Sequence, residues 1–192
     1  MVLLIAGLII FLGVHSIRIV AEDWRAERIR RMGERRWKGI YAVISIVGFV
    51  VLVWGFGLAR HTPVTLWTSP YGMRHVTALL VLPAFILVVA AYVPGTHIRK
   101  ALGHPMLAGT ALWAFAHLLS NGGLADVVLF GAFLVWAAIG FVNARARDRK
   151  AAVTYPALGA SRDVIAVVVG TIAWAVFGMF LHGPLIGVRP FG

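Results

Sequence analysis

Two histidines placed within long apolar runs are the residues of this sequence best suited to chemistry. Among the seven histidines of the 192-residue chain, His15 and His117 lie well inside such runs, whereas His182 and His104 lie at the ends of others. An ionisable side chain inside an apolar run is costly, which makes each one a functional candidate. Imidazole is the commonest neutral metal ligand in proteins, so this pair indicates metal or haem binding.

The residues around each histidine extend this interpretation. Positions three and four residues away share the face of a helix. For His117 they supply an aromatic ring, a small side chain, a hydroxyl and an amide: Trp113, Ala114, Ser120 and Asn121. This set leaves room for a planar ligand and offers it a hydrogen-bonding partner. One turn beyond His15, Arg18 could pair with a carboxylate of the same ligand.

The residues alone leave two interpretations of the histidine pair open. Two histidines on different helices of a bundle can hold haem b, but the same side chains could be hydrogen-bonding groups between helices. At about 1.5 Å of rise per residue, His15 lies roughly 20 Å and His117 roughly 6 Å below the outer surface. One haem held by both would need a strongly tilted ring or a deeply sunk helix 105–120. His104, nearer the cytoplasmic face, could replace either ligand.

The composition excludes several classes of cofactor and partner. The chain has no cysteine, which excludes disulfides, thiolate metal ligands, iron–sulfur clusters and covalent c-type haem. Only 13% of the residues are charged, against roughly 25% in a typical soluble domain. A net charge of +11 could suggest nucleic acid, but the basic residues lie in short gaps between apolar runs. The expected partner is therefore a lipid bilayer and not nucleic acid.

The apolar runs predict an all-α membrane bundle of six transmembrane helices, forming a single domain over residues 1–192. A helix that crosses the hydrocarbon core needs roughly 20 mostly apolar residues, and six stretches reach or approach that length. They are Val2–Val20, Ile40–Ala59, His75–Val93, Pro105–Ser120, Leu124–Val142 and Val164–His182. Only Asn121-Gly122-Gly123 separates the fourth from the fifth, which predicts a tight helical hairpin.

The basic residues predict the orientation of these helices. Of the 18 Lys and Arg residues, only Arg60, Arg74 and Arg189 lie away from the first, third and fifth connections. Because cytoplasmic loops carry the excess of positive charge, those three connections are expected in the cytoplasm. Both termini are then expected on the outer side.

Several motifs resemble the NnrU family along nearly the whole chain. The motifs are Arg36-Trp37-Lys38-Gly39-Ile40-Tyr41 with Ser45 and Gly48, Arg74-His75, Tyr92-Val93-Pro94-Gly95, His104-Pro105-Met106, the run Leu112-Trp113-Ala114-Phe115-Ala116-His117-Leu118-Leu119-Ser120-Asn121-Gly122, Leu129-Phe130-Gly131 and Leu181-His182-Gly183-Pro184-Leu185-Ile186-Gly187. The resemblance implies a multi-pass protein of the bacterial inner membrane with periplasmic termini, linked to nitrite and nitric oxide reductase expression in denitrifying bacteria.

The same resemblance implies haem b as a cofactor. The NnrU family is related to the plant and cyanobacterial 15-cis-zeta-carotene isomerase, a membrane enzyme whose b-type haem governs a cis-to-trans isomerisation. Its haem-ligating histidines correspond to His15 and His117. The isomerase has a cysteine three residues before the second histidine, where this chain has Ala114. Ligand exchange through a thiol is therefore impossible in this chain.

These expectations define three functional hypotheses, and whether the protein is an enzyme stays open. The first is a membrane haem-b protein of nitrogen-oxide metabolism that binds a small gaseous or apolar ligand. In it His15 and His117 are the axial ligands, Arg18 pairs with a propionate, and Trp113, Asn121 and His104 lie nearby. The second is a haem-dependent isomerase of a polyene. The third is a membrane accessory protein or transporter whose histidines are polar contacts between helices.

Overall fold

Long α-helices form most of the protein in the computed structural model, which describes residues 1–191. Every backbone N–H and C=O inside a lipid core must be satisfied within the chain, and a helix achieves this. The elements are α1 (Val2–Val20), α2 (Glu22–Met32), α3 (Glu34–Ala59), α4 (Met73–Tyr92), α5 (His97–Leu102), α6 (Pro105–Ser120), α7 (Leu124–Lys150), α8 (Ala160–Val176), the π-helix η1 (Phe177–Leu181) and α9 (His182–Ile186).

The prediction of an all-α membrane bundle is confirmed. Within residues 1–191, five helices are long and apolar enough to cross a membrane: α1, α3, α4, α7 and the continuous segment Ala160–Ile186. The sixth predicted helix is α6, which is apolar but has only 16 residues. Its bounds and those of α1 agree with the prediction.

Other helices extend beyond the predicted apolar stretches. Helix α3 begins at Glu34 instead of Ile40, and α7 continues from Val142 to Lys150. Hydropathy marks only the part of a helix that lies in hydrocarbon, whereas the backbone hydrogen bonds continue into the polar layer. The last turn of α7 is basic, which suits the partial negative charge at a helix C-terminus.

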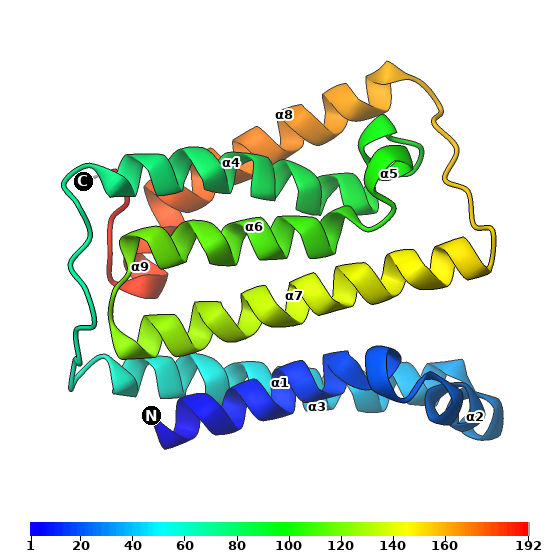
Figure 1. Cartoon of the computed structure of the whole chain (residues 1–192), viewed down its shortest axis with the longest axis horizontal. Helices are drawn as coiled ribbons and strands as arrows, with labels where there is room; N and C mark the ends of the chain where they lie inside the picture. The colour runs from blue at the N-terminus through cyan, green and yellow to red at the C-terminus, as the bar shows by residue number, and fades with distance from the viewer. Residues whose placement is uncertain (192) are drawn as a thin grey trace.

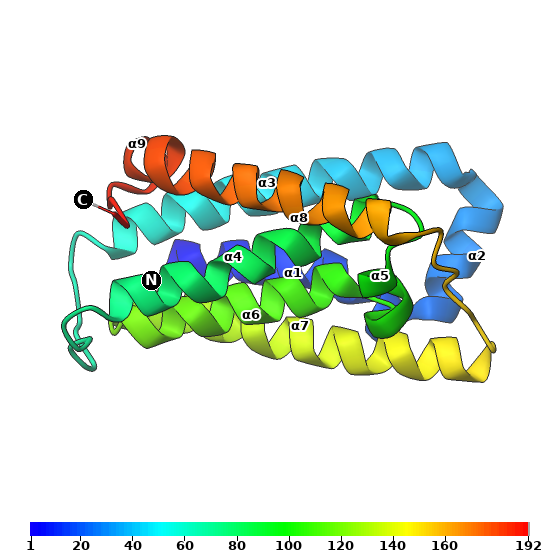
Figure 2. The ribbon, with the colours of Figure 1, turned by 90° about the horizontal axis from the view of Figure 1, so that it is seen from above.

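The six long helices pack as an open strip in the order α3, α1, α7, α6, α4, α8. Each helix contacts its neighbour in that order, and among residues 1–191 α3 and α8 do not contact each other. Figure 1 shows both termini, the 60–72 loop and the α6–α7 turn at one end, called here the terminal end. Helices α2 and α5 and residues 151–159 lie at the other end, called the basic end (Figures 1 and 2).

Glycines allow α1 and α3 to approach closely. A Cβ on Gly7 would collide with the backbone of Leu52, and a Cβ on Gly55 would collide with the backbone of Leu4. Small residues at a helix crossing bring two backbones into van der Waals contact, which drives helix association in lipid. This crossing fixes the height of α1 against α3 and therefore the height of His15 in the bundle.

A short pairing closes the terminal end over α6 and α7. Leu66 donates its backbone N–H to the carbonyl of Gly122 at 2.8 Å, and Leu124 donates to Val64 at 2.8 Å. A Cβ on Gly122 would collide with Trp67, so glycine is required in the predicted turn. The 60–72 loop is thereby held close to the last turn of α6, which carries His117.

Candidate functional site

His117 lies in the last turn of α6 among aromatic rings. Its imidazole stacks on Phe130 of α7 with ring centroids 4.7 Å apart and an interplanar angle of 25°, and it contacts Trp113 at 5.1 Å. Nδ1 lies 2.8 Å from the carbonyl oxygen of Trp113. A carbonyl only accepts hydrogen bonds, so Nδ1 carries the hydrogen and the lone pair of the neutral ring is on Nε2. This tautomer leaves Nε2 available to bind a metal.

Two further predicted residues gather at His117. Trp113 provides both the carbonyl and one of the ring contacts. Asn121 donates its side-chain amide to the carbonyl oxygen of His117 at 2.8 Å and to Ser120 at 3.1 Å. Ala114, at the position of the isomerase cysteine, is fully buried at 0% exposure. The residues predicted to share one face of α6 therefore lie together around His117.

His15 has the same local geometry at a different place. Its Nδ1 lies 2.6 Å from the carbonyl oxygen of Phe11, so its lone pair is also on Nε2. The ring meets Tyr41 of α3 at 5.2 Å and Trp136 of α7 at 6.0 Å, both edge to face. The indole N–H of Trp136 is buried without a hydrogen-bond partner.

The structure does not bring His15 and His117 together. The ring contacts of His15 and those of His117 are joined through Phe133, which contacts Phe11 at 5.9 Å and Trp113 at 5.7 Å.

The two histidines also lie at different heights. His117 stacks on Phe130, and Phe130 contacts Phe56. Phe56 directly follows Gly55, the residue that packs on Leu4 of α1. His117 is therefore level with the first turn of α1, and His15 lies eleven residues beyond Leu4, or roughly 15 Å lower.

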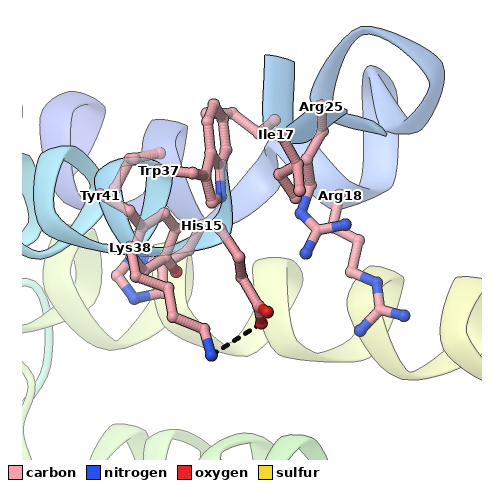
Figure 3. Close-up of a pocket in the computed structure, with 10 residues that line it drawn as sticks. His15, Ile17, Arg18, Arg25, Trp37, Lys38 and Tyr41 are labelled. Carbon is pink, nitrogen blue, oxygen red and sulfur yellow. Dashed lines mark ion pairs between the residues drawn. The ribbon is translucent and has the colours of Figure 1, made fainter. Parts of the chain in front are cut away.

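A pocket of about 280 Å³ opens beside His15 at the basic end (Figure 3). Its walls come from α1, α2 and α3, and three of its side chains are cationic: Arg18, Arg25 and Lys38. One carboxylate, Glu34, also lines it and pairs with Lys38 at 2.8 Å, the contact drawn as a dashed line. The lining therefore has a net positive charge.

Arg18 already has a carboxylate partner within the chain. Its Nε lies 3.7 Å from Glu22, which also accepts a hydrogen bond from Arg25 at 3.1 Å. The Arg18 side chain is 62% exposed, so this ion pair is weak and can yield to another anion.

His104 lies at the basic end and belongs to a separate polar cluster. Its Nε2 is 2.9 Å from Asp148 of α7, and the Tyr155 hydroxyl donates to the same carboxylate oxygen at 3.0 Å. Arg99 lies over the Tyr155 ring at 5.3 Å. Burial, followed by the hydrogen bond and negative charge of Asp148, raises the pKa of Tyr155 above its usual value of 10.0.

Five charged or aromatic side chains of the His15 pocket were not predicted from the sequence: Arg25, Glu34, Trp37, Lys38 and Tyr41. Tyr41 follows Lys38 by three residues and Trp37 by four, so helical spacing could have placed it on one face with each of them. Arg25 had no such signal, because its position depends on the turn between α1 and α2. Among residues 1–191, no three His, Cys, Asp or Glu side chains form a metal cluster.

A comparison with protein families assigns the chain to a family. The model of the family described as NnrU protein matches residues 3–190, which is nearly the whole chain. No curated protein and no solved structure matches the chain. The match takes in all six long helices, His15, His117 and the terminal segment after α8, so the chain is a member of the NnrU protein family.

Proposed function

We propose that this protein binds haem b inside the membrane and that His117 would be one of the residues that hold it. The observation that carries the proposal is the state of the imidazole: Nδ1 is fixed on the Trp113 carbonyl, which leaves the Nε2 lone pair free. A metal-ligating histidine is usually oriented by such a hydrogen bond on its other nitrogen. The aromatic neighbours Trp113 and Phe130 supply the flat, apolar surroundings that a macrocycle requires.

The residues of this site fit the group by their chemistry. Haem iron accepts a neutral histidine, and the polarity and access of its pocket decide between ligand binding and electron transfer. When bound, haem would supply reversible redox chemistry or the binding of a small gas such as nitric oxide. The chain itself would orient the imidazole through Trp113 and hold the last turn of α6 through Asn121.

The resemblance implies His15 as the second ligand, and the distance argues for a separate role. Two imidazoles on one iron place their Nε2 atoms on the order of 4 Å apart, twice a typical metal–imidazole bond. The two histidines lie roughly 15 Å apart in height. We therefore assign His117 to the haem and His15 to the pocket at the basic end.

The positive charge of that pocket favours a second candidate function, the binding of a nitrogen oxyanion such as nitrite. Three cationic side chains and one carboxylate line it, and the His15 Nε2 can accept a proton or a hydrogen bond at its inner wall. Tyr41 adds a hydroxyl donor. Such an anion would displace Glu22 from Arg18, because an exposed ion pair contributes at most about 1 kcal/mol.

The haem proposal is tested by measuring haem per chain in protein purified from haem-supplied cells. We expect close to one haem in the native chain and a large loss in His117→Ala. The control is Phe115→Ala, which removes an exposed ring from the opposite face of the same helix. A native chain without haem, or a His117→Ala variant that keeps it, would overturn the assignment.

The oxyanion proposal is tested by titrating nitrite against the purified protein, with chloride as the competing anion. We expect binding that weakens at least tenfold in Arg25→Gln and that high salt suppresses, because the attraction is electrostatic. Equal binding by native protein and by Arg25→Gln would contradict it. The variant leaves His117 untouched, so this result is independent of the haem.

A further inference from the structure

The terminal segment after α8 carries another histidine, His182, which lies at about the height of His117. We propose that His182 supplies the second imidazole to the haem held by His117, an inference that rests on the proposed function. In the sequence, His182 stands out only by its place at the end of the last apolar run.

The height of His117 follows from its contact with α4. The Thr77 hydroxyl donates to the backbone carbonyl of Ala116 at 2.9 Å, in a buried contact between α4 and α6. Thr77 is in the second turn of α4, counted from the terminal end. His117 is one residue beyond Ala116 and is therefore level with this part of α4.

The height of His182 follows from the packing of α8 on α4. A Cβ on Gly170 would lie 2.7 Å from the Cα of Ile86, so these two positions are directly opposed. The helices run in opposite directions, and Trp174 donates its indole N–H to the carbonyl of Ala78 at 3.0 Å. Twelve residues beyond Gly170, His182 is level with the start of α4, within roughly 5 Å of the height of His117.

The imidazole of His182 makes the same kind of hydrogen bond as those of His15 and His117. Its Nδ1 lies 2.7 Å from the carbonyl oxygen of Val188, so the lone pair is on Nε2. The ring stands edge-on to Phe177, with centroids 5.7 Å apart and an interplanar angle of 86°. His182 can thus bind a metal through the same nitrogen as His117.

The chain after α8 turns toward the open side of the bundle, between α3 and α8. The π-helix η1, Phe177–Leu181, ends directly before His182, and π-turns inside helices are frequent at functional sites. Arg60 at the end of α3 donates to the carbonyl of Ile186 at 2.7 Å, which ties α9 to α3 (Figures 1 and 2). Arg60 also lies over the Phe56 ring at 5.6 Å, and Phe56 contacts Phe130, the ring on which His117 stacks. The α8–α9 segment therefore reaches, at the height of His117, the side of the bundle where α3 and α8 leave the strip open.

Spectroscopy of the haem-loaded protein tests this ligand pair. In the native chain we expect a six-coordinate, low-spin haem. In His182→Ala we expect a five-coordinate, high-spin spectrum that returns to low spin when imidazole is added. His15→Ala is the matched control and keeps the native spectrum. A His182→Ala protein that stays low spin without imidazole overturns the ligand pair alone, whereas a native chain without haem overturns the proposed function and the pair with it.

Because the chain has no cysteine, cross-linking can test the proximity of the two positions without haem. The double variant His117→Cys with His182→Cys should join through a short bifunctional thiol reagent, detected by mass spectrometry of the linked peptides. The control pair His15→Cys with His182→Cys should not join. The opposite pattern, with linkage only in the control pair, contradicts the inference.

Discussion

At the scale of single residues, hydrogen bonds divide four of the histidines into two kinds. His15, His117 and His182 each have Nδ1 against a backbone carbonyl, which leaves Nε2 as the basic nitrogen. His104 instead has Nε2 against the Asp148 carboxylate. The first kind is suited to bind a ligand within the bundle, whereas His104 links α6 to α7 at the basic end.

Tyr155 gives a prediction on pH at this scale. Burial and Asp148 raise its pKa above 10.0, so the neutral hydroxyl and its hydrogen bond are favoured in the folded protein. The stability from this contact is present below pH 10 and is lost as the pH rises through the raised value. The protein and its Tyr155→Phe variant should be titrated and followed by ultraviolet absorption. The difference between the two curves should show one tyrosine that ionises above pH 10. Ionisation at or below the usual pH would contradict the assigned contact.

At the scale of helices, the closest approach is the glycine crossing of α1 and α3. A side chain at Gly55 would collide with the backbone of Leu4, and backbone cannot move aside as a side chain can. Gly57, two residues on, has open space around its Cβ position. These two glycines therefore have different roles in one helix.

Replacing each glycine by alanine should separate those roles. We expect Gly55→Ala to lower the free energy of unfolding by about 1–3 kcal/mol, the usual cost of overpacking. Gly57→Ala should be neutral or stabilising by up to about 1 kcal/mol, because alanine favours the helix. Reversible unfolding in detergent micelles measures both. Equal destabilisation by the two variants would argue against the crossing.

At the scale of the whole molecule, the charge distribution predicts which end faces the cytoplasm. We propose that the basic end faces the cytoplasm of a bacterial inner membrane and that both termini are periplasmic. A reporter enzyme that is active only in the periplasm should be active when fused after Phe191 and inactive when fused after Ala152. Activity at the second position alone would reverse the orientation.

The helix positions could be predicted from the sequence, whereas their lateral packing could not. Apolar length located α1 and α6 to the residue, and the rise per residue gave His15 and His117 different heights. The pairing of His117 with Phe130 depends on which helices are neighbours, a property of tertiary packing. The return of α9 through Arg60 is another such contact, so His182 had no local signal beyond its place in an apolar run.

The absorption spectrum of the purified protein, oxidised and reduced, tests the central claim most directly. Native protein and His15→Ala should both show a Soret band and sharp bands on reduction, and His117→Ala should lose or shift them. A native protein without a Soret band after expression with ample haem would contradict the claim. Loss of the bands in His15→Ala with retention in His117→Ala would contradict the assignment of His117 as the ligand.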